Sequence, residues 1–277
     1  MCVAAAPAHF SETILYHGRC HHPSHGRVHV LGYQNVATNR ATGPNAMLLH
    51  LPGVGMTQDN FVDTSGSRRI LTDMAWALGP PISVGYGAAL SRSAPPVVQV
   101  FEHDIYTVVL AANAALIPEA LCLVPERRRV PANLDLFDFY ARMYPDYAVA
   151  LCCFDNRDAA RSAPLLLWYE PLHPDRAELP AIDCHTGGVP DLGGPVHVDH
   201  WVILGTDEEA APPDGEWTTA RMNWSEEVLR SPAGAFLPAA ITGRTYTGVL
   251  PNGDFMIPQV DLLEGRMTAM RRVGPLA

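Results

Sequence analysis

The chain has 277 residues, of which 48% are hydrophobic and 17% are charged, and its formal net charge is −10. This composition argues against disorder, and the lack of a basic stripe argues against binding a nucleic-acid backbone or an anionic membrane surface. All 19 basic residues are Arg, which excludes lysine-dependent chemistry such as a P-loop or a pyridoxal phosphate Schiff base.

Strand-like segments dominate the chain. They are short runs rich in apolar, β-branched and aromatic residues, and several are apolar throughout, as in strands buried on both faces. In chain order they are Thr13–His17, Val28–Tyr33, Ala46–Leu51, Val97–Phe101, Tyr106–Leu110, Tyr147–Phe154, Leu165–Tyr169, His200–Leu204, Thr245–Val249 and Phe255–Ile257.

Helices are fewer, and three are expected from apolar residues at helical spacing and from capping residues. They are Ser67–Leu78 with Ser65 or Ser67 as its cap, Asn133–Met143, and Ser225–Leu229 with Ser225 as its cap. Cys20–Gly26 and Thr206–Glu216 are expected to be surface loops. The pattern predicts a strand-rich, mixed α/β (α+β) fold in a single globular domain over residues 1–277.

Several other segments have a structural interpretation. Cys152 and Cys153 lie within an apolar run and are expected in the core. The loop Leu51–Ser65 is interpreted as a turn that leads into a helix cap. The pair Trp168-Tyr169 is expected to be core or sheet-face aromatics, and the run Arg127–Arg129 is expected to be a solvated turn.

The expected location is cytoplasmic. No apolar run is long enough for a transmembrane helix, and the N-terminal residues lack the pattern of a secretory signal. The six cysteines are scattered without a C-x-x-C motif, so no disulfide framework is expected.

The first candidate site is at the N-terminus. Removal of Met1 would leave Cys2 with a thiol and a free α-amine of pKa about 8 on one residue, and such a nucleophile with its own base can hydrolyse amides. A hairpin that turns near Ser11-Glu12 would bring Arg19 back beside Cys2. There it would lower the pKa of the thiol and bind a carboxylate or carbonyl of the substrate.

The chain begins with Met-Cys, and Gly18-Arg19 follows at nearly the distance from Cys2 at which choloylglycine hydrolases have Gly-Arg. In these features it resembles that family, which belongs to the cysteine branch of the N-terminal nucleophile hydrolases. The resemblance implies an αββα sandwich and a hydrolase of non-peptide C–N bonds, with a small-molecule substrate and no cofactor. It implies that Cys2 is the nucleophile and that its α-amine is the base, with Arg19 on the substrate side.

The chain departs from this family directly after the motif. Cys20 and His22 stand where the family has Asn and Asp. The Asn that would stabilise the oxyanion is not identified by position, and the candidates by residue type are Asn45, Asn60 and Asn252.

A glycine-rich segment, 183–200, is the second candidate site. Cys184, His185, His197 and His200 are residue types that bind zinc or another divalent transition metal. Alternatively, Cys184 and either His197 or His200 form a nucleophile–base pair that Asp199 or Asp183 orients. The segment thus favours a metal-binding protein or metalloenzyme, or a second type of cysteine enzyme.

The third hypothesis is a non-catalytic protein that binds a partner or assembles with itself as a homo-oligomer. It predicts that the Cys and His residues share no pocket. A spatial test separates the hypotheses, because an active site requires Cys2, the Cys20–His25 loop and the Cys184–His200 segment to converge.

Overall fold

A computed structural model describes residues 3–40, 43–79, 97–155, 157–158 and 162–274. It is strand-rich with short helices, and its sheets contain both parallel and antiparallel pairs. The predicted mixed α/β class is therefore confirmed.

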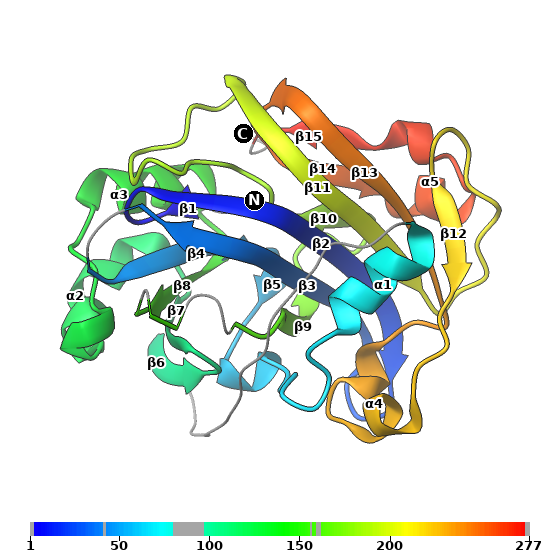
Figure 1. Cartoon of the computed structure of the whole chain (residues 1–277), viewed down its shortest axis with the longest axis horizontal. Coiled ribbons are helices and arrows are strands. Elements are labelled where there is room, and N and C mark those ends of the chain that lie inside the picture. The colour runs from blue at the N-terminus through cyan, green and yellow to red at the C-terminus, as the bar shows by residue number, and fades with distance from the viewer. Residues whose placement is uncertain (1–2, 41–42, 80–96, 156, 159–161, 275–277) are drawn as a thin grey trace.

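The largest sheet has seven strands, and the long hairpin of β2 and β3 forms its centre (Figure 1). β11 runs parallel to β2, and the other neighbours are antiparallel. In spatial order the strands are β12 (Thr218–Arg221), β13 (Ala240–Pro251), β11 (Pro195–Thr206), β2 (Ala8–His22), β3 (Gly26–Asn39), β9 (Leu165–Pro171) and β5 (Gly53–Val54).

Two further sheets complete the β structure. The five-stranded sheet is antiparallel, in the order β1 (Val3–Ala4), β4 (Asn45–Leu51), β8 (Ala148–Phe154), β7 (Tyr106–Ala111) and β6 (Val98–His103). The three-stranded sheet consists of β10 (Arg176–Leu179), β14 (Asp254–Pro258) and β15 (Arg271–Val273).

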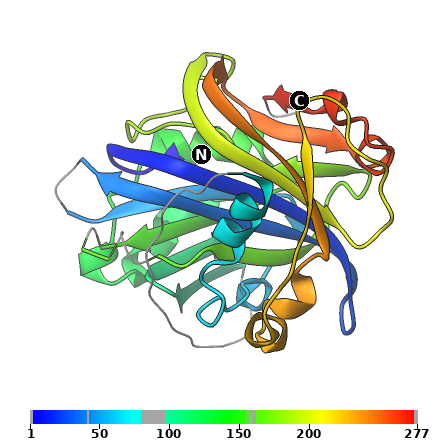
Figure 2. The same cartoon turned by 45° about the vertical axis from the view of Figure 1, so that its right-hand side comes forward.

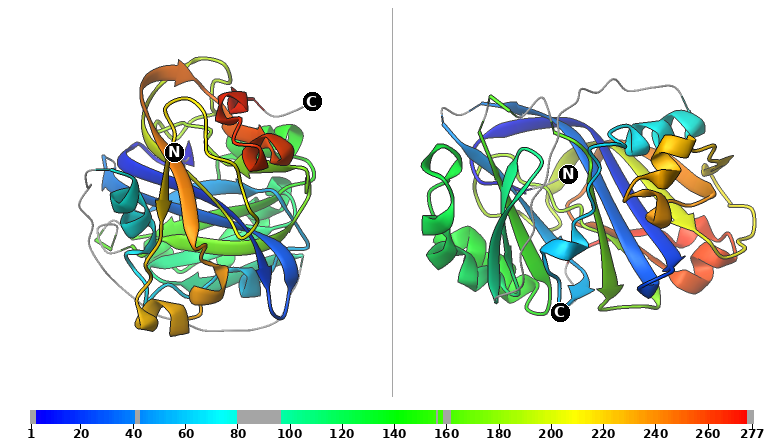
Figure 3. Two further views of the ribbon diagram at one scale, coloured as in Figure 1. Left: turned by 90° about the vertical axis from the view of Figure 1, so that its right-hand side faces the viewer. Right: turned by 90° about the horizontal axis from the view of Figure 1, so that it is seen from below.

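Helices cover the outer faces of the two larger sheets. They are α1 (Ile70–Leu78), α2 (Ile117–Ala120), α3 (Leu134–Met143) and α4 (Glu226–Arg230). A further helix, α5 (Gln259–Leu263), packs against β14 and β10 of the three-stranded sheet. Seen from below, α2 and α3 lie outside the five-stranded sheet, and α1 and α4 lie outside the seven-stranded sheet (Figure 3). This is the helix–sheet–sheet–helix order of an αββα sandwich, but layer order does not by itself identify a family or a function.

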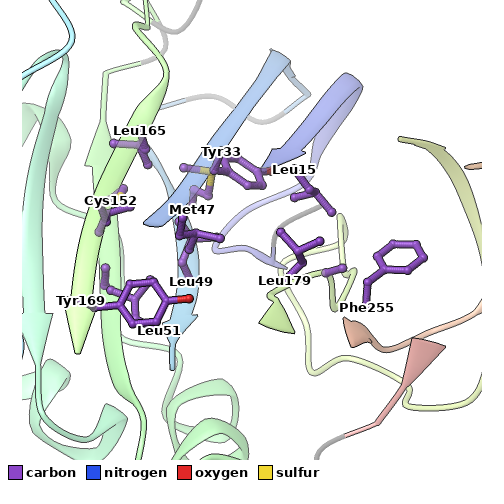
Figure 4. Packing of buried hydrophobic residues seen from close by; sticks show 14 of the residues in the cluster. Leu15, Tyr33, Met47, Leu49, Leu51, Cys152, Leu165, Tyr169, Leu179 and Phe255 are labelled. Atoms are coloured by element: carbon purple, nitrogen blue, oxygen red, sulfur yellow. The ribbon is translucent and has the colours of Figure 1, made fainter. Parts of the chain in front are cut away.

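The main core lies between the sheets (Figure 4). Because successive side chains of a strand point to opposite faces of its sheet, every second side chain faces this core. On β8, Ala150 and Cys152 face this core, whereas Leu151 and Cys153 face the layer of α2 and α3. Both cysteines are fully buried, which confirms the prediction that they are core residues.

The predicted cap at Ser225 is confirmed, and the second helix also has a side-chain cap, which was not predicted. The Asn133 side chain accepts a hydrogen bond from Leu136 N at the start of α3, and Ser225 accepts one from Val228 N at the start of α4. α1 begins after Arg69 without a side-chain cap, so the predicted serine cap is wrong. The sequence pattern missed α2 and α5, which are only four and five residues long.

The predicted hairpin near Ser11-Glu12 is also wrong. β2 continues through this point with an irregular register between Ser11 and Ile14, and Glu12 has a φ of 56°. A bulge bends a strand locally without ending it, so the turn residues that suggested a hairpin instead mark a bulge within β2.

Among the described residues, no helix has both the length and the apolar character needed to cross a bilayer.

Candidate functional site

The predicted N-terminal site is not assembled around Arg19. Cys2 itself lies outside the described residues, so its role as a nucleophile stays a prediction. Val3 pairs with Leu48 in the five-stranded sheet, and β2 carries Arg19 ~36 Å along the strand beyond Ala8 at the usual rise of a strand. The placement of Arg19 beside the N-terminal strand is therefore wrong.

Arg19 has a different role in the structure. Its guanidinium pairs with Glu208, which Arg27 also contacts. It lies near the β2–β3 turn, at the end of the sheet where Thr206 of β11 is its neighbour. The predicted strand ends at His17, whereas β2 continues to His22 and includes Arg19. Only the tertiary structure supplies the carboxylate partner of this Arg.

The second predicted site is divided between two places. The Cys184 Sγ contacts Thr186 Oγ1 at 3.3 Å and the Gly188 carbonyl at 3.4 Å, in a tight local loop. The His185 Nε2 approaches Asp183 Oδ1 to 2.7 Å, without hydrogen-bond geometry. This loop adjoins the N-terminal strand, because Ala4 N donates to the Cys184 carbonyl.

The remaining residues of that site lie on β11 and alternate across the sheet. His197 and Asp199 are exposed, whereas His200 is buried, with only 1% of its area accessible. His200 pairs with Thr13, whereas the His185 carbonyl bonds Ala8 N, so about 15 Å of β2 separates the two histidines. The proposed pairing of Cys184 with His200 is therefore not formed.

The described part of the chain holds no group of three or more His, Cys, Asp or Glu side chains arranged to bind a metal ion. The predicted ligands Cys184, His185, His197 and His200 are thus not brought together. The Cys20–His25 segment lies at the far end of the β2–β3 hairpin, so the two described segments of the spatial test do not converge (Figure 2).

The amide candidates for an oxyanion hole have structural partners instead. The Asn45 Oδ1 accepts a hydrogen bond from Ala6 N at 2.9 Å. The Asn252 amide group donates to the Asp183 carbonyl at 2.8 Å, and that of Asn60 donates to the Trp168 carbonyl at 2.7 Å. These bonds fix loops rather than an active site.

Aromatic, imidazole and carboxylate side chains do come together in a groove of about 520 Å³, here called the aromatic groove. The β2–β3 turn, the loop around η1 (Gln58–Asn60), the end of β6, β9 and η6 (Gly234–Phe236) line it. Its aromatic lining residues are His22, His25, Phe61, Phe101, His103, Trp168 and Phe236.

Four of these rings form a two-layer stack. The His25 ring lies 4.0 Å from that of Trp168 and 4.6 Å from that of His22, and the His22 ring lies 4.6 Å from that of Phe236. The rings of Trp168 and Phe236 are parallel to within 10° and only 6.3 Å apart. If the four rings were stacked in a single column, the Trp168 and Phe236 centroids would be much farther apart than this. The rings are therefore arranged in two adjacent layers.

Hydrogen bonds hold the wall of the groove in place. The Trp168 indole donates to the Asp59 carbonyl at 3.0 Å, and the Gln99 side chain accepts from Gln58 N at 2.9 Å. Thr57 and Asn60 form a capping box around η1. The loop that the sequence suggested to be only a turn and a helix cap is therefore a fixed wall of the groove.

The groove is acidic at neutral pH. Asp59, Asp63 and Glu102 line it, and Glu102 also pairs with the buried Arg128. Desolvation lowers the pKa of His103 to about 4. Desolvation and the neighbouring His25 lower the pKa of His22 as well, so both rings are neutral at pH 7.

The sequence missed most of this site. The density of histidines in Cys20–His25 and the polar loop Leu51–Ser65 were its signals, and the rings that stack on the histidines come from positions 168 and 236. Arg128 was expected in a solvated turn, but it is 7% exposed and bonds Glu102 and Thr107. Such long-range partners leave no mark in local periodicity.

No protein-family profile and no curated protein matches the chain. Similar solved structures include baculovirus P35: a mutated form after caspase cleavage has 11% identity and a TM-score of 0.49, covering 90% of this chain and 97% of that one. P35 itself has 10% identity and a TM-score of 0.44, covering 99% and 94%. A caspase-8/P35 complex has 11% identity and a TM-score of 0.39, covering 96% and 91%. With TM-scores this low, the likeness assigns neither a family nor a function to this chain.

Proposed function

We propose that this chain is a binding protein that docks a segment of a protein partner in the aromatic groove. The observation that carries the proposal is the two-layer stack of Trp168, His25, His22 and Phe236 beside carboxylates. Aromatic side chains in fixed positions are the residues that contribute most to binding energy at protein interfaces.

The proposal belongs to the class of the third hypothesis from the sequence, a non-catalytic protein that binds a partner. It differs from that hypothesis in one respect, because His22, His25 and His103 share the aromatic groove. The hydrolase hypothesis has no support from the position of Arg19, and the metal hypothesis has none from the position of the predicted ligands. Preorganisation favours binding, since the hydrogen bonds of Trp168 and Asn60 fix the wall before a partner arrives.

A displayed library of random ten-residue peptides tests the proposal. We expect selection against the intact chain to enrich peptides that bind with micromolar affinity. The substitution Trp168→Ala should weaken their binding at least tenfold, because truncation of a central aromatic residue removes the stacking surface. Fluorescence anisotropy of the labelled peptides measures the change.

Trp76→Ala is the matched control. Trp76 is 42% exposed on α1, outside the groove, where Arg69 stacks over its ring. Its loss should leave peptide binding unchanged. Peptides that bind Trp168→Ala as tightly as the original chain, or a library that yields no binder, would show that the groove is not the docking site.

A further inference from the structure

β6 is an edge strand of the five-stranded sheet, and its outer side pairs with no other described segment. Its hairpin with β7 turns at Asp104-Ile105, where Asp104 has a φ of 50°. In a two-residue hairpin the flanking pair, here His103 and Tyr106, is the hydrogen-bonded one. Along an antiparallel ladder, hydrogen-bonded and non-hydrogen-bonded residue pairs alternate. The bond from Ala112 N to the Val97 carbonyl, at the other end of the strand, agrees with this alternation.

The alternation determines which backbone groups are available. Every second residue of β6, starting at His103, directs its N–H and C=O toward β7. The residues between them, Val98, Val100 and Glu102, therefore direct theirs to the open edge. An unpaired row of this kind is a template for a further strand.

The open edge lies beside the aromatic groove. Phe101 and His103 of β6 line the groove, and the Phe61 ring contacts them at 5.1 Å and 5.4 Å between ring centroids. A strand added to β6 would place alternate side chains over these rings and toward Trp168. The edge and the groove thus offer one continuous binding surface with main-chain and side-chain contacts.

The charges of the groove select the side chains of that strand. Asp59 and Asp63 add negative charge, the histidines His22 and His103 are neutral at pH 7, and no Arg is among the described lining residues. An Arg or Lys side chain is attracted by these carboxylates and also stacks favourably on an indole ring.

We propose that the partner segment binds as an extended strand added to the open edge of β6, with an Arg or Lys side chain in the aromatic groove. This inference rests on the proposed docking function and specifies its geometry and the chemistry of its partner.

The substitution Val100→Pro tests the strand addition, with the library-selected peptide as the binding partner. Proline removes the N–H that points to the open edge and keeps the pairing of Gln99 and Phe101 with β7, as is usual for Pro on an edge strand. Val100→Ala is the control, since it trims the side chain and keeps the N–H. We expect Val100→Pro to weaken binding at least tenfold and Val100→Ala by less than threefold, with circular dichroism showing that both fold.

Changes in the peptide provide an independent readout that does not depend on folding of the variants. N-methylation of its backbone amides should abolish binding at alternate positions only. Replacement of its Arg or Lys by norleucine should weaken binding at least tenfold. Uniform tolerance of N-methylation, or no effect of norleucine, would overturn the inference.

The outcomes separate this inference from the proposed function. If Trp168→Ala abolishes binding while Val100→Pro does not, the groove binds a partner but the strand addition is wrong. If neither has an effect, the proposed function fails as well. Sedimentation that shows a dimer dissociating in Val100→Pro would overturn the inference in favour of edge pairing between two copies of the chain.

Discussion

The free energy of unfolding is expected to fall steeply as the pH is lowered from about 6.5 to about 4. The cause is a set of neutral histidines, three of them buried and the fourth, His103, half-buried, for which desolvation is the largest effect on the pKa. The pKa is lowered to about 4 for His29 and His103, to about 3 for His200, and well below its usual 6.5 for His17.

The direction follows from linkage. The folded-state pKa of each histidine lies below its unfolded value, so the unfolded chain takes up protons first. This contribution to stability is fully present above about pH 6.5 and is lost as the pH falls toward the folded-state pKa. Each histidine contributes a slope of up to about 1.4 kcal/mol per pH unit in that range. The close pair His17 and His29, with 3.1 Å between Nε2 and Nδ1, is expected to titrate as a unit.

Urea unfolding at a series of pH values measures the slope, and His200→Asn provides the matched variant. The Asn oxygen can replace His200 Nδ1 as the acceptor of the bond from Asp199 N, 3.0 Å away in the structure. The number of protons taken up on unfolding near pH 5 should then decrease by about one, and the slope of the unfolding free energy against pH should decrease accordingly. A stability that stays constant between pH 7 and pH 5 in the original chain would contradict the burial of these histidines.

The second large effect is expected at Asp254, which connects the three-stranded sheet to the five-stranded sheet. Its carboxylate lies 2.9 Å from His50 Nε2 and accepts hydrogen bonds from the Tyr144 hydroxyl at 2.6 Å, Ala181 N at 2.6 Å and Ile182 N at 3.1 Å. Burial by itself raises the pKa of Asp254. His50, the backbone donors and Tyr144 outweigh burial and hold the pKa below its usual value.

Asp254→Ala is expected to destabilise the protein by about 3–5 kcal/mol, because it leaves several buried donors without an acceptor. Asp254→Asn is the control, since its oxygen can still accept from Ala181 N and Ile182 N, and its cost should be clearly smaller. Tyr144→Phe should cost about 1 kcal/mol, as for one lost hydrogen bond. Equal stabilities of the Ala and Asn variants in urea would contradict this role of Asp254.

The local pattern of the sequence predicted the strands well. Segments such as Leu165–Tyr169 and Tyr147–Phe154 lie within or next to β9 and β8, because side-chain alternation and apolar runs depend only on neighbours along the chain. The Ser225 cap of α4 was predicted for the same reason, since a cap joins residues within one turn. The missing cap of α1 and the bulge at Glu12 show where packing overrides these local preferences.

The candidate site could not be predicted in the same way. Cys184 and His200 are close in sequence, yet Cys184 bridges to Val3 while His200 lies on β11. By contrast, His22 and Phe236 are far apart in sequence, and their rings stack in the groove. Similarly, the acidic partner of Arg19 is Glu208, which lies in the connection after β11. Residue type and spacing identified groups capable of chemistry but not which of them meet.

The sequence by itself determined a strand-rich, mixed α/β chain with an acidic surface and a buried pair of cysteines, since hydrophobic periodicity and composition act locally. Only the tertiary structure decided that the histidine-rich turn faces Trp168 and Phe236 and that β6 ends the five-stranded sheet with an open edge. Both depend on the register between strands and on contacts between distant segments, which the whole core fixes at once.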